Sequence, residues 1–374
     1  MSTFIIEPTS YDFASFLKYR DKIIVSELPN ILQVLENIAE DELKARLDPL
    51  QSSHISYLQS DNTFVLVRND GNGRIQFMPT SPSGMKFYRG ENDFHEVCKP
   101  SLFRGLSGNR ILIEQLKTCE FILLLESHPI VRDFLNSGYD IDHVGMAQHY
   151  GLKTNILDLT NNKWVAAFFA CTKTNSTGAY ELLDGSYENK MGILYSLDIE
   201  PESFGKDVIV VGAQPFERPT RQNAFALSLS EDDNFNDRKG LGIIPFKHDK
   251  ESESILFDMF YRSKKLFPDD MLVDVVSQIN EINEISCGAV SFCKTVYYSN
   301  VSDNDWEKYL KQTGLSIVPE TTIRFDEEKL NIQYKFWCNY GRDRLMRRTQ
   351  CHLVTSFKFD NFQFQSSRCP LRQN

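Results

Sequence analysis

The stretch that most constrains the fold is AQHYGLKTNILDLT, residues 147–160, because it places polar side chains around a short apolar segment. Gly151 follows a run with helical spacing that begins near Asp142, and glycine is a common helix stop. Ile156 and Leu157 then read as a short strand. Buried polar groups are costly unless they are paired. The stretch therefore predicts a helix–turn–strand unit whose polar side chains form either a local hydrogen-bond network or a functional site.

The composition favours a large folded protein. The chain has 374 residues, 41% of them hydrophobic and 25% charged, which is ordinary for globular proteins. Its length favours two compact units, or one large core with additions. The 27 Phe and 15 Tyr suggest a core that contains a sheet. We expect an α+β fold in which a mixed or antiparallel sheet is flanked by helices.

The sequence offers no sign of secretion, of membrane insertion or of a metal site. The first residues, MSTFIIEPTSYDF, lack the basic start and apolar block of a signal peptide. The longest apolar run, FILLL, is far shorter than the roughly 20 residues needed to span a bilayer. Eight cysteines lie scattered, with no pair or Cys/His cluster at zinc-ligand spacing. We expect a cytoplasmic protein with reduced thiols and leave its oligomeric state open.

Periodicity divides the chain into three expected units. Residues 1–85 predict a helical and β-hairpin extension, from SELPNILQVLENIAEDELKARL and NTFVLVRNDGNGRIQFMP. Residues 86–300 form the central domain, in which GAVSFCKTVYYS is expected to be a strand. Residues 301–374 are expected to be a basic, β-rich C-terminal unit, with strands at KLNIQYKFWCNYG and SFKFDNFQFQ. The charged stretch 302–308 marks the boundary before it.

Charge is distributed unevenly along the chain. Residues 335–374 carry eight basic and two acidic groups, so this tail is +6, against -10 for the whole protein and near -16 for the rest. Such asymmetry can indicate an anionic partner, including nucleic acid. It can equally reflect docking of the tail on the acidic body of its own chain. Seven aromatic residues in the tail favour folded structure there.

Several motifs together resemble the FRG domain family. FYRGENDFHEVCKPSLFRG places Tyr88, Arg89 and Gly90 at the family's aromatic-Arg-Gly triplet, and Arg104 at its later aromatic-Arg position. AQHYGLKTNILDLT is similar to the family's Gln-His-Tyr-Gly-Leu-Pro-Thr-x-Leu-Leu-Asp-Trp-Thr pattern. RPTRQNAFAL and LFPDD resemble two later elements, so the likeness extends over roughly residues 86–280.

The sequence departs from the family pattern at three positions. Lys153 stands where Pro is usual, Asn155 where Arg is common, and Leu159 where Trp is usual. Losing Pro relaxes the backbone, and losing Trp removes a stacking surface and a donor. Neither change removes a group that transfers protons.

The family also resembles ADP-ribosyltransferases, in which an aromatic-Arg-Gly strand helps hold a dinucleotide. The resemblance implies an NAD-dependent transferase or hydrolase that acts on a macromolecule, with a toxin or defence role. Arg89 would then grip phosphate, because a guanidinium forms a rigid fork, and Gly90 would let the ligand approach the backbone. Arg104 is a second candidate anchor. Alternatively, Arg89 is paired with a carboxylate of the core.

His149 and Asp158 can each be interpreted in two ways. His149 would bind ribose hydroxyls or move a proton, or else be a helix-terminal histidine. Asp158 would orient His149 or Arg89, or cap the helix that begins near Asn161, and capping is favoured. The dinucleotide contacts implied by the resemblance fall on the following residues: Tyr88, Arg89, Gly90, Arg104, Gln148, Tyr150, Thr160, Arg218 and Gln222.

The enzyme hypothesis also requires an acid that stabilises the positive charge growing on the ribose. Glu251 and Glu253 in ESESILF are superficially suitable, but their spacing relative to Leu256 favours the first turn of an amphipathic helix. Two other classes therefore stay open. One is a non-catalytic binding module, and the other is a protein that binds nucleic acid through residues 335–374.

Overall fold

The main sheet of the computed structural model is antiparallel throughout. The structure describes residues 10–47, 64–68, 72–79, 86–175, 178–199, 208–347 and 349–354. Six strands hydrogen-bond in the order β10 (Leu241–Lys247), β7 (Met191–Asp198), β3 (Lys86–Glu91), β4 (Ile156–Thr160), β9 (Ala224–Ser228) and β8 (Val208–Ile209). Every neighbouring pair runs antiparallel. With helices packed around this sheet, the predicted α+β class is confirmed.

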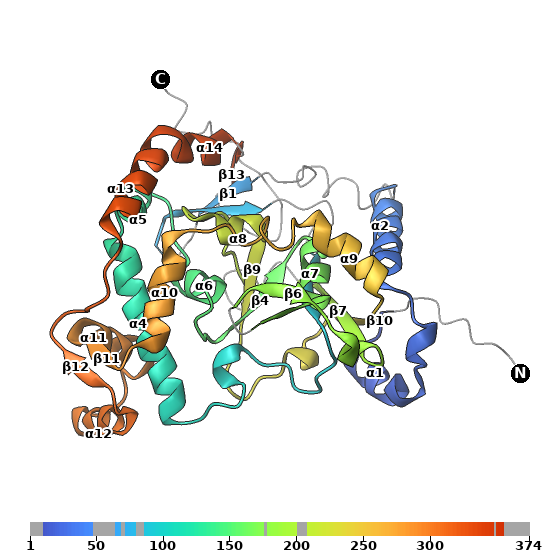
Figure 1. Cartoon of the computed structure of the whole chain (residues 1–374), viewed down its shortest axis with the longest axis horizontal. Coiled ribbons are helices and arrows are strands. Elements are labelled where there is room, and N and C mark those ends of the chain that lie inside the picture. Colours follow the sequence, from blue (N-terminus) through green and yellow to red (C-terminus); the bar gives the residue numbers. More distant parts are fainter. Residues whose placement is uncertain are drawn as a thin grey trace, which may run out of the picture.

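The two faces of the main sheet bury different clusters. On one face Phe87, Leu157 and Tyr195 pack with Phe16 of α1 (Phe13–Tyr19). On the other face Tyr88 packs beneath three helices, which are α2 (Ile31–Leu47), α7 (Lys163–Ala170) and α9 (Lys250–Met259). This alternation along β3 follows from the two-residue period of a strand. The two N-terminal helices α1 and α2 therefore pack on opposite faces of the sheet, and both are seen at the right of Figure 1.

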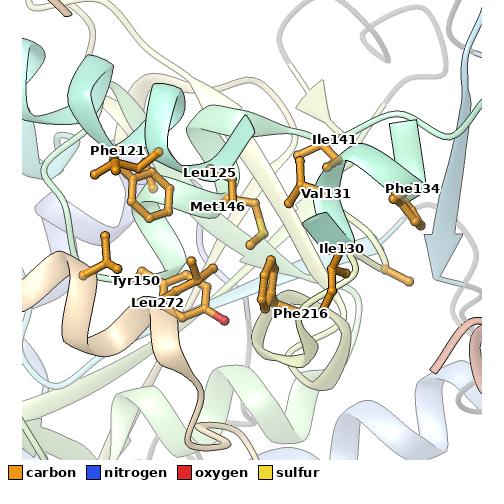
Figure 2. Packing of buried hydrophobic residues seen from close by; sticks show 14 of the residues in the cluster. Phe121, Leu125, Ile130, Val131, Phe134, Ile141, Met146, Tyr150, Phe216 and Leu272 are labelled. Carbon is orange, nitrogen blue, oxygen red and sulfur yellow. The ribbon is translucent and has the colours of Figure 1, made fainter. Parts of the chain in front are cut away.

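A second core lies under the helices at the left of Figure 1. Its helices are α4 (Asn109–Ser127), α5 (Pro129–Asn136), α6 (His143–His149) and α10 (Met271–Glu281). Phe121, Met146, Phe216 and Leu272 meet there, and Figure 2 shows Tyr150 beside them. Burial of such large side chains stabilises the fold by about 2 kcal/mol each. Met146 and Ala147 of α6 are buried in this core, which fixes the helix among its neighbours.

Smaller elements surround the main sheet and the three clusters of buried side chains. The expected hairpin is confirmed as β1 (Phe64–Arg68) and β2 (Ile75–Pro79), and β13 (Thr349–Val354) pairs parallel to β1. Two short sheets consist of β5 (Thr172–Thr174) with β6 (Tyr180–Leu182), and β11 (Glu284–Ser286) with β12 (Ser316–Val318). Besides short 3₁₀ helices, the described residues also form α8 (Glu217–Arg221), α11 (Cys287–Tyr297), α12 (Asp303–Thr313), α13 (Glu327–Phe336), a π-helical turn (Trp337–Gly341) and α14 (Arg342–Arg347). Among the described residues, no helix combines the length and the apolar character that crossing a membrane requires.

Two expected strands are helices. GAVSFCKTVYYS forms α11, because Ser286 caps its first turn and Ala289 and Cys293 bury one helical face against α4. KLNIQYKFWCNYG forms α13 and the π-helical turn, with Asp326 as the N-cap. In both segments aromatic and β-branched residues favour strands locally, but capping and tertiary packing decide the outcome. SFKFDNFQFQ lies outside the described residues, and the stretch 302–308 opens α12.

His128 is a buried histidine that contributes to this fold. Its Nδ1 accepts a hydrogen bond from the Ile130 backbone N–H at 3.2 Å and so caps α5. Its ring meets Phe216 and Phe325 edge to face, with centroids 5.1 and 5.0 Å apart. Burial lowers the pKa of His128 to about 4. The folded protein therefore keeps this ring neutral where an unfolded chain would protonate it.

Replacing His128 with Asn should make stability less sensitive to acid. Asn keeps an N-cap acceptor but does not titrate, so the variant loses free energy at pH 7 through lost ring packing. As the pH falls from 6.5 towards 4, only the native His128 protein loses stability through this residue, by up to about 3 kcal/mol. Urea denaturation at several pH values measures the difference in the free energy of unfolding between the two proteins. This difference should become smaller as the pH falls from 6.5 towards 4. A His95→Asn control, at an exposed position, should run parallel to wild type; a constant gap for His128→Asn would contradict the assignment.

Candidate functional site

A cavity of about 590 Å³ opens where β3 and β4 separate. The two strands share one residue pair, Tyr88 with Thr160, whereas β4 pairs with β9 along its whole length. Residues from the later parts of β3 and β4 line the cavity, together with the end of α6, one side of α7 and the strands β5 and β6. Its volume lies in the usual range for small-molecule sites, roughly 300–1,000 Å³.

The sequence around Gly151 positions the polar side chains of this cavity. Asp142 caps α6, and Gly151 takes a φ of +95°, so the helix stops there and the chain turns directly into β4. Gln148 then connects helix and strand, because its Nε2 donates to Asp158 Oδ2 at 3.1 Å and its Oε1 accepts from Thr154 Oγ1 at 2.6 Å. The expected helix–turn–strand unit is confirmed, with its polar side chains both paired and at a cavity.

Arg89 lines the cavity as a paired residue. Its Nη2 lies 2.5 Å from Glu91 Oε1, and its Nη1 donates to the Asp158 carbonyl oxygen at 2.9 Å. Burial works against the charge, but the surrounding negative groups, Glu91 foremost, raise the pKa of Arg89 above its ordinary value. Of the two readings of Arg89, the ion pair with a carboxylate is therefore the one present. Both ends of its fork are engaged within the protein.

Glu91 is a cavity residue that the motifs did not single out. Only 16% of its side chain is exposed, and it lines the cavity beside Arg89. The signal was present in the sequence, because residues two apart on a strand point to the same face. In the structure β3 continues to Glu91, one residue beyond Gly90, so that Arg89 and Glu91 share one face of the strand.

His149 projects from the last turn of α6 and is held by Gln222. Its Nδ1 lies 2.9 Å from Gln222 Oε1, and Gln222 Nε2 donates to the Leu266 carbonyl oxygen at 3.2 Å. Since this amide presents its oxygen to the ring, His149 Nδ1 must carry the hydrogen and donate it. Burial lowers the pKa of His149, against the opposing influence of Asp158 and Gln222. The ring is therefore neutral near pH 7, with a lone pair on Nε2.

That lone pair faces a carboxylate. His149 Nε2 lies 3.9 Å from Asp158 Oδ1, and among the described residues neither atom has a hydrogen-bond partner. The His149 side chain is 3% exposed and the Asp158 side chain 39%. A hydroxyl group placed beside these two acceptors can donate its one proton to either of them. The pair can therefore bind a hydroxyl and take up its proton.

Asp158 does not cap the following helix, contrary to the favoured reading. The cap of α7 is Asn162, whose Oδ1 accepts from the Trp164 backbone N–H. Asp158 lies inside β4, where its backbone pairs with Ala226 of β9. The alternating face of the strand turns its side chain towards α6 and the cavity. The other reading of Asp158, that it orients His149 or Arg89, agrees with this position.

The other candidates divide into two groups. Thr160 lines the cavity and donates its hydroxyl to the Gln222 carbonyl oxygen at 2.8 Å. Tyr150 and Arg218 lie behind the cavity wall, where the guanidinium covers the Tyr150 ring at 4.6 Å and the phenol bonds Asp270. The following predicted residues line the cavity: Tyr88, Arg89, Gly90, Arg104, Gln148, His149, Asp158, Thr160 and Gln222.

Gly90 serves helix packing. A Cβ at this position would lie 1.9 Å from the carbonyl oxygen of Ala166 and 2.7 Å from the amide nitrogen of Ala170. The absent side chain therefore lets α7 pack directly on β3. Close approach of a helix backbone, as well as of a ligand, explains glycine here.

Cationic and aromatic groups complete the cavity. Arg104 is exposed at its margin, and Lys153, at a position where the family usually has Pro, lies 3.6 Å from Glu114. Phe169 and Tyr180 form an aromatic wall that the motifs did not predict, and Tyr180 stacks on Phe267 with centroids 4.4 Å apart. Such a wall suits a flat ring, and Arg104 suits an anion.

Glu251 and Glu253 are helix residues, as their spacing predicts. Both lie in the first turn of α9, and Glu253 is buried with its Oε1 2.6 Å from His248 Nδ1. Neither lines the cavity. The carboxylates that do are Glu91 and Asp158.

Comparison with known proteins agrees with the motifs. The family model described as the FRG domain matches residues 85–178, so the chain carries an FRG domain over this range. The match contains the Tyr88–Gly90 triplet and the whole of AQHYGLKTNILDLT, and the expectation of an FRG domain is confirmed. Gln222, which holds His149, lies beyond the matched range. No curated protein and no solved structure matches the chain.

Replacing Gly90 with Ala should destabilise the protein by about 3 kcal/mol, because the new methyl group would meet the backbone of α7. Chemical denaturation measures the loss. Gly185→Ala is the matched control, because its Cβ would meet no atom closer than 3.5 Å, and a change within about 0.5 kcal/mol is expected there. Equal stability of Gly90→Ala and wild type would refute the packing role.

Replacing Gln222 with Glu should raise the pKa of His149 above its usual value of 6.5, because a carboxylate at Nδ1 favours the imidazolium. In wild type the same ring should titrate below 6.5 and show the Nδ1–H neutral tautomer. Two-bond ¹H–¹⁵N NMR of the histidine rings measures both properties. Gln278→Glu, on the exposed side of α10, should leave His149 unchanged. A wild-type His149 that titrates near 6.5 as the other tautomer would contradict the geometry.

Proposed function

We propose that the FRG domain cleaves a dinucleotide such as NAD at its ribose–nicotinamide bond and passes ADP-ribose to a macromolecule or to water. One observation carries the proposal: His149 and Asp158, from helix and strand, turn towards each other two acceptor atoms that have no hydrogen-bond partner among the described residues, at the same 590 Å³ cavity that Arg104 borders. A binding module would need a shaped pocket, but it would not need a neutral base opposite a carboxylate. The arrangement therefore favours an enzyme.

Asp158 fills the role for which the sequence offered no convincing acid. As the bond from ribose C1 to the nicotinamide nitrogen breaks, its electron pair leaves with the ring, which becomes neutral nicotinamide. Positive charge grows on the ribose, and a nearby carboxylate stabilises it. The Asp158 side chain is 39% exposed and lines the cavity, so a sugar can approach it. Gln148 and Arg89 fix its side-chain and backbone oxygens.

His149 suits the second half of the reaction. The acceptor oxygen or nitrogen forms a bond to ribose C1 and loses a proton, for which a neutral imidazole with a free Nε2 is a suitable base. Burial keeps the ring neutral, and Gln222 fixes the tautomer that leaves Nε2 unprotonated. The proton then resides on Nε2, where Asp158 stabilises the charged ring.

The anionic part of the substrate needs a cation that is not already engaged. Arg89 is paired with Glu91, so we assign phosphate binding to Arg104, which is exposed at the edge of the cavity. Phe169 and Tyr180 offer flat surfaces for a ring of the substrate. Arg89 is in this scheme a positioning residue that holds Glu91 and the Asp158 backbone.

The described part of the basic tail favours docking on its own chain over nucleic-acid binding. Arg342 forms an ion pair with Asp133, and Arg344 Nη1 lies 2.9 Å from Glu217 Oε1. Trp337 Nε1 donates to the same Asp133 at 2.7 Å. Self-docking was one of the two readings of the charge asymmetry, and these contacts support it.

Replacing Asp158 with Asn should slow nicotinamide release by about 100-fold or more while NAD binding changes by only a few-fold, because charge stabilisation is lost and shape is kept. Chromatography of nicotinamide and calorimetry with NAD measure the two effects. Arg104→Ala should weaken binding, and Glu251→Gln, on the exposed first turn of α9, should match wild type. Failure of wild type to bind NAD at millimolar concentration would overturn the proposal, as would an unimpaired rate in Asp158→Asn.

A further inference from the structure

A second cavity, of about 240 Å³, lies between the core formed by α4, α5, α6 and α10 and the C-terminal helices α13 and α14. One wall comes from α8 and the turn that precedes α10, and the other from α13, the π-helical turn and α14. Figure 1 shows α13 and α14 at the upper left, with α5 beside them and α10 below. The lining is largely apolar, with Ile130, Phe216, Phe336, Trp337 and Leu345 among it.

Specific contacts fix both walls of this cavity. The Trp337 indole donates to Asp133 at 2.7 Å and its ring meets Phe134 edge to face, with centroids 6.1 Å apart. Arg344 Nη1 lies 2.9 Å from Glu217 Oε1, so α14 is tied to α8. π-Helical turns are uncommon and occur frequently at functional sites. The cavity is thus a preformed space between anchored elements.

Two side-chain amide oxygens make this cavity rich in hydrogen-bond acceptors. Gln214 and Gln333 line it, and in the described part of the chain the Oε1 atom of each is buried without a hydrogen-bond partner. Gln214 is 5% exposed, and its Nε2 donates to the Val211 carbonyl oxygen, so the amide cannot be reversed without loss. A buried acceptor left unpaired costs about 1–3 kcal/mol. A ligand that donates hydrogen bonds would recover this cost.

The charges around the cavity are mainly negative. Three carboxylates line it. Glu217 is paired with both Arg344 and Arg221, Asp270 accepts a hydrogen bond from the Tyr150 phenol, and Asp269 is exposed. The guanidinium among the lining residues is that of Arg344. An anion would meet these carboxylates and the two amide oxygens together. A cation would be attracted by both, and aromatic rings such as Trp337 also attract cations.

We propose that this cavity binds a small organic cation that carries N–H donors on a flat apolar frame, such as an aryl amidine or aryl amine. The frame packs between Phe216 and Trp337, and the N–H groups donate to Gln214 and Gln333. The site is separate from the 590 Å³ cavity between β3 and β4, with which it shares no lining residue. Its existence does not depend on the proposed NAD chemistry.

Three probes of one shape test the proposal: benzamidine, benzamide and benzoate. Trp337 lines the cavity, so the NMR signal of its indole N–H reports binding in the full chain labelled at tryptophan. The Trp337→Phe variant, which lacks this signal, assigns it. Benzamidine should shift this signal with saturation. Benzamide should bind at least tenfold more weakly, and benzoate should not bind. Equal effects of all three probes, or no shift with benzamidine, would overturn the assignment.

Paired variants identify the acceptors. Gln214→Met and Gln333→Met keep the side-chain length but remove the amide oxygen, and each should weaken benzamidine binding about tenfold. Gln333 lies on the more accessible helix α13, so this variant keeps the test valid if Gln214→Met does not fold. Gln278→Met, exposed on α10, should bind as wild type does. Unchanged affinity in a folded Gln333→Met protein would count against the proposal.

Discussion

The guanidinium of Arg89 connects two strands whose backbones are joined at a single residue pair. Beyond Tyr88 and Thr160, β3 and β4 separate, and Arg89 reaches across to the Asp158 carbonyl oxygen while it pairs with Glu91. A charge-assisted hydrogen bond thus stands where a sheet would normally continue its ladder. Because side chains rather than backbone join the strands here, the sheet remains continuous and still leaves room for a cavity. The positions of Asp158 and Glu91 both depend on this bridge.

Burial, more than sequence neighbours, decides the chemistry of the cavity. His149 faces a carboxylate, which alone would favour an imidazolium, yet desolvation lowers its pKa and keeps the ring neutral. Gln222 adds the choice of tautomer, and Leu266 fixes the orientation of Gln222 through its carbonyl oxygen. A glutamine 73 positions away in the chain thus determines which nitrogen of His149 is free. Such control is a property of the fold and cannot be assigned to any one motif.

The sequence predicted the elements where local chemistry is decisive. Asp142 and Gly151 bound α6 because capping and a left-handed stop act within one turn. The FRG motifs brought nine candidate residues to one cavity, which spacing alone would not have done. The failures have both long-range and local causes. α11 contains aromatic residues typical of strands, but it buries Ala289 and Cys293 in one cluster with residues of α4. α13 buries none of its residues and starts at the N-cap Asp326. The cap of α7 is Asn162 rather than Asp158, a difference of four positions within one local segment.

The short helix α8 lies between the two cavities. Its residues Glu217 and Thr220 line the C-terminal cavity, whereas Gln222, the residue that follows this five-residue helix, lines the other cavity and holds His149. Asp270 provides a second connection, since it lines the C-terminal cavity and bonds the phenol of Tyr150, next to His149. If occupancy of one cavity moves α8, thermodynamic linkage requires that occupants of the two cavities change each other's affinity by the same factor. A helix of only five residues has few residues over which such a displacement could be absorbed. Binding in one cavity would then change the equilibrium of binding in the other.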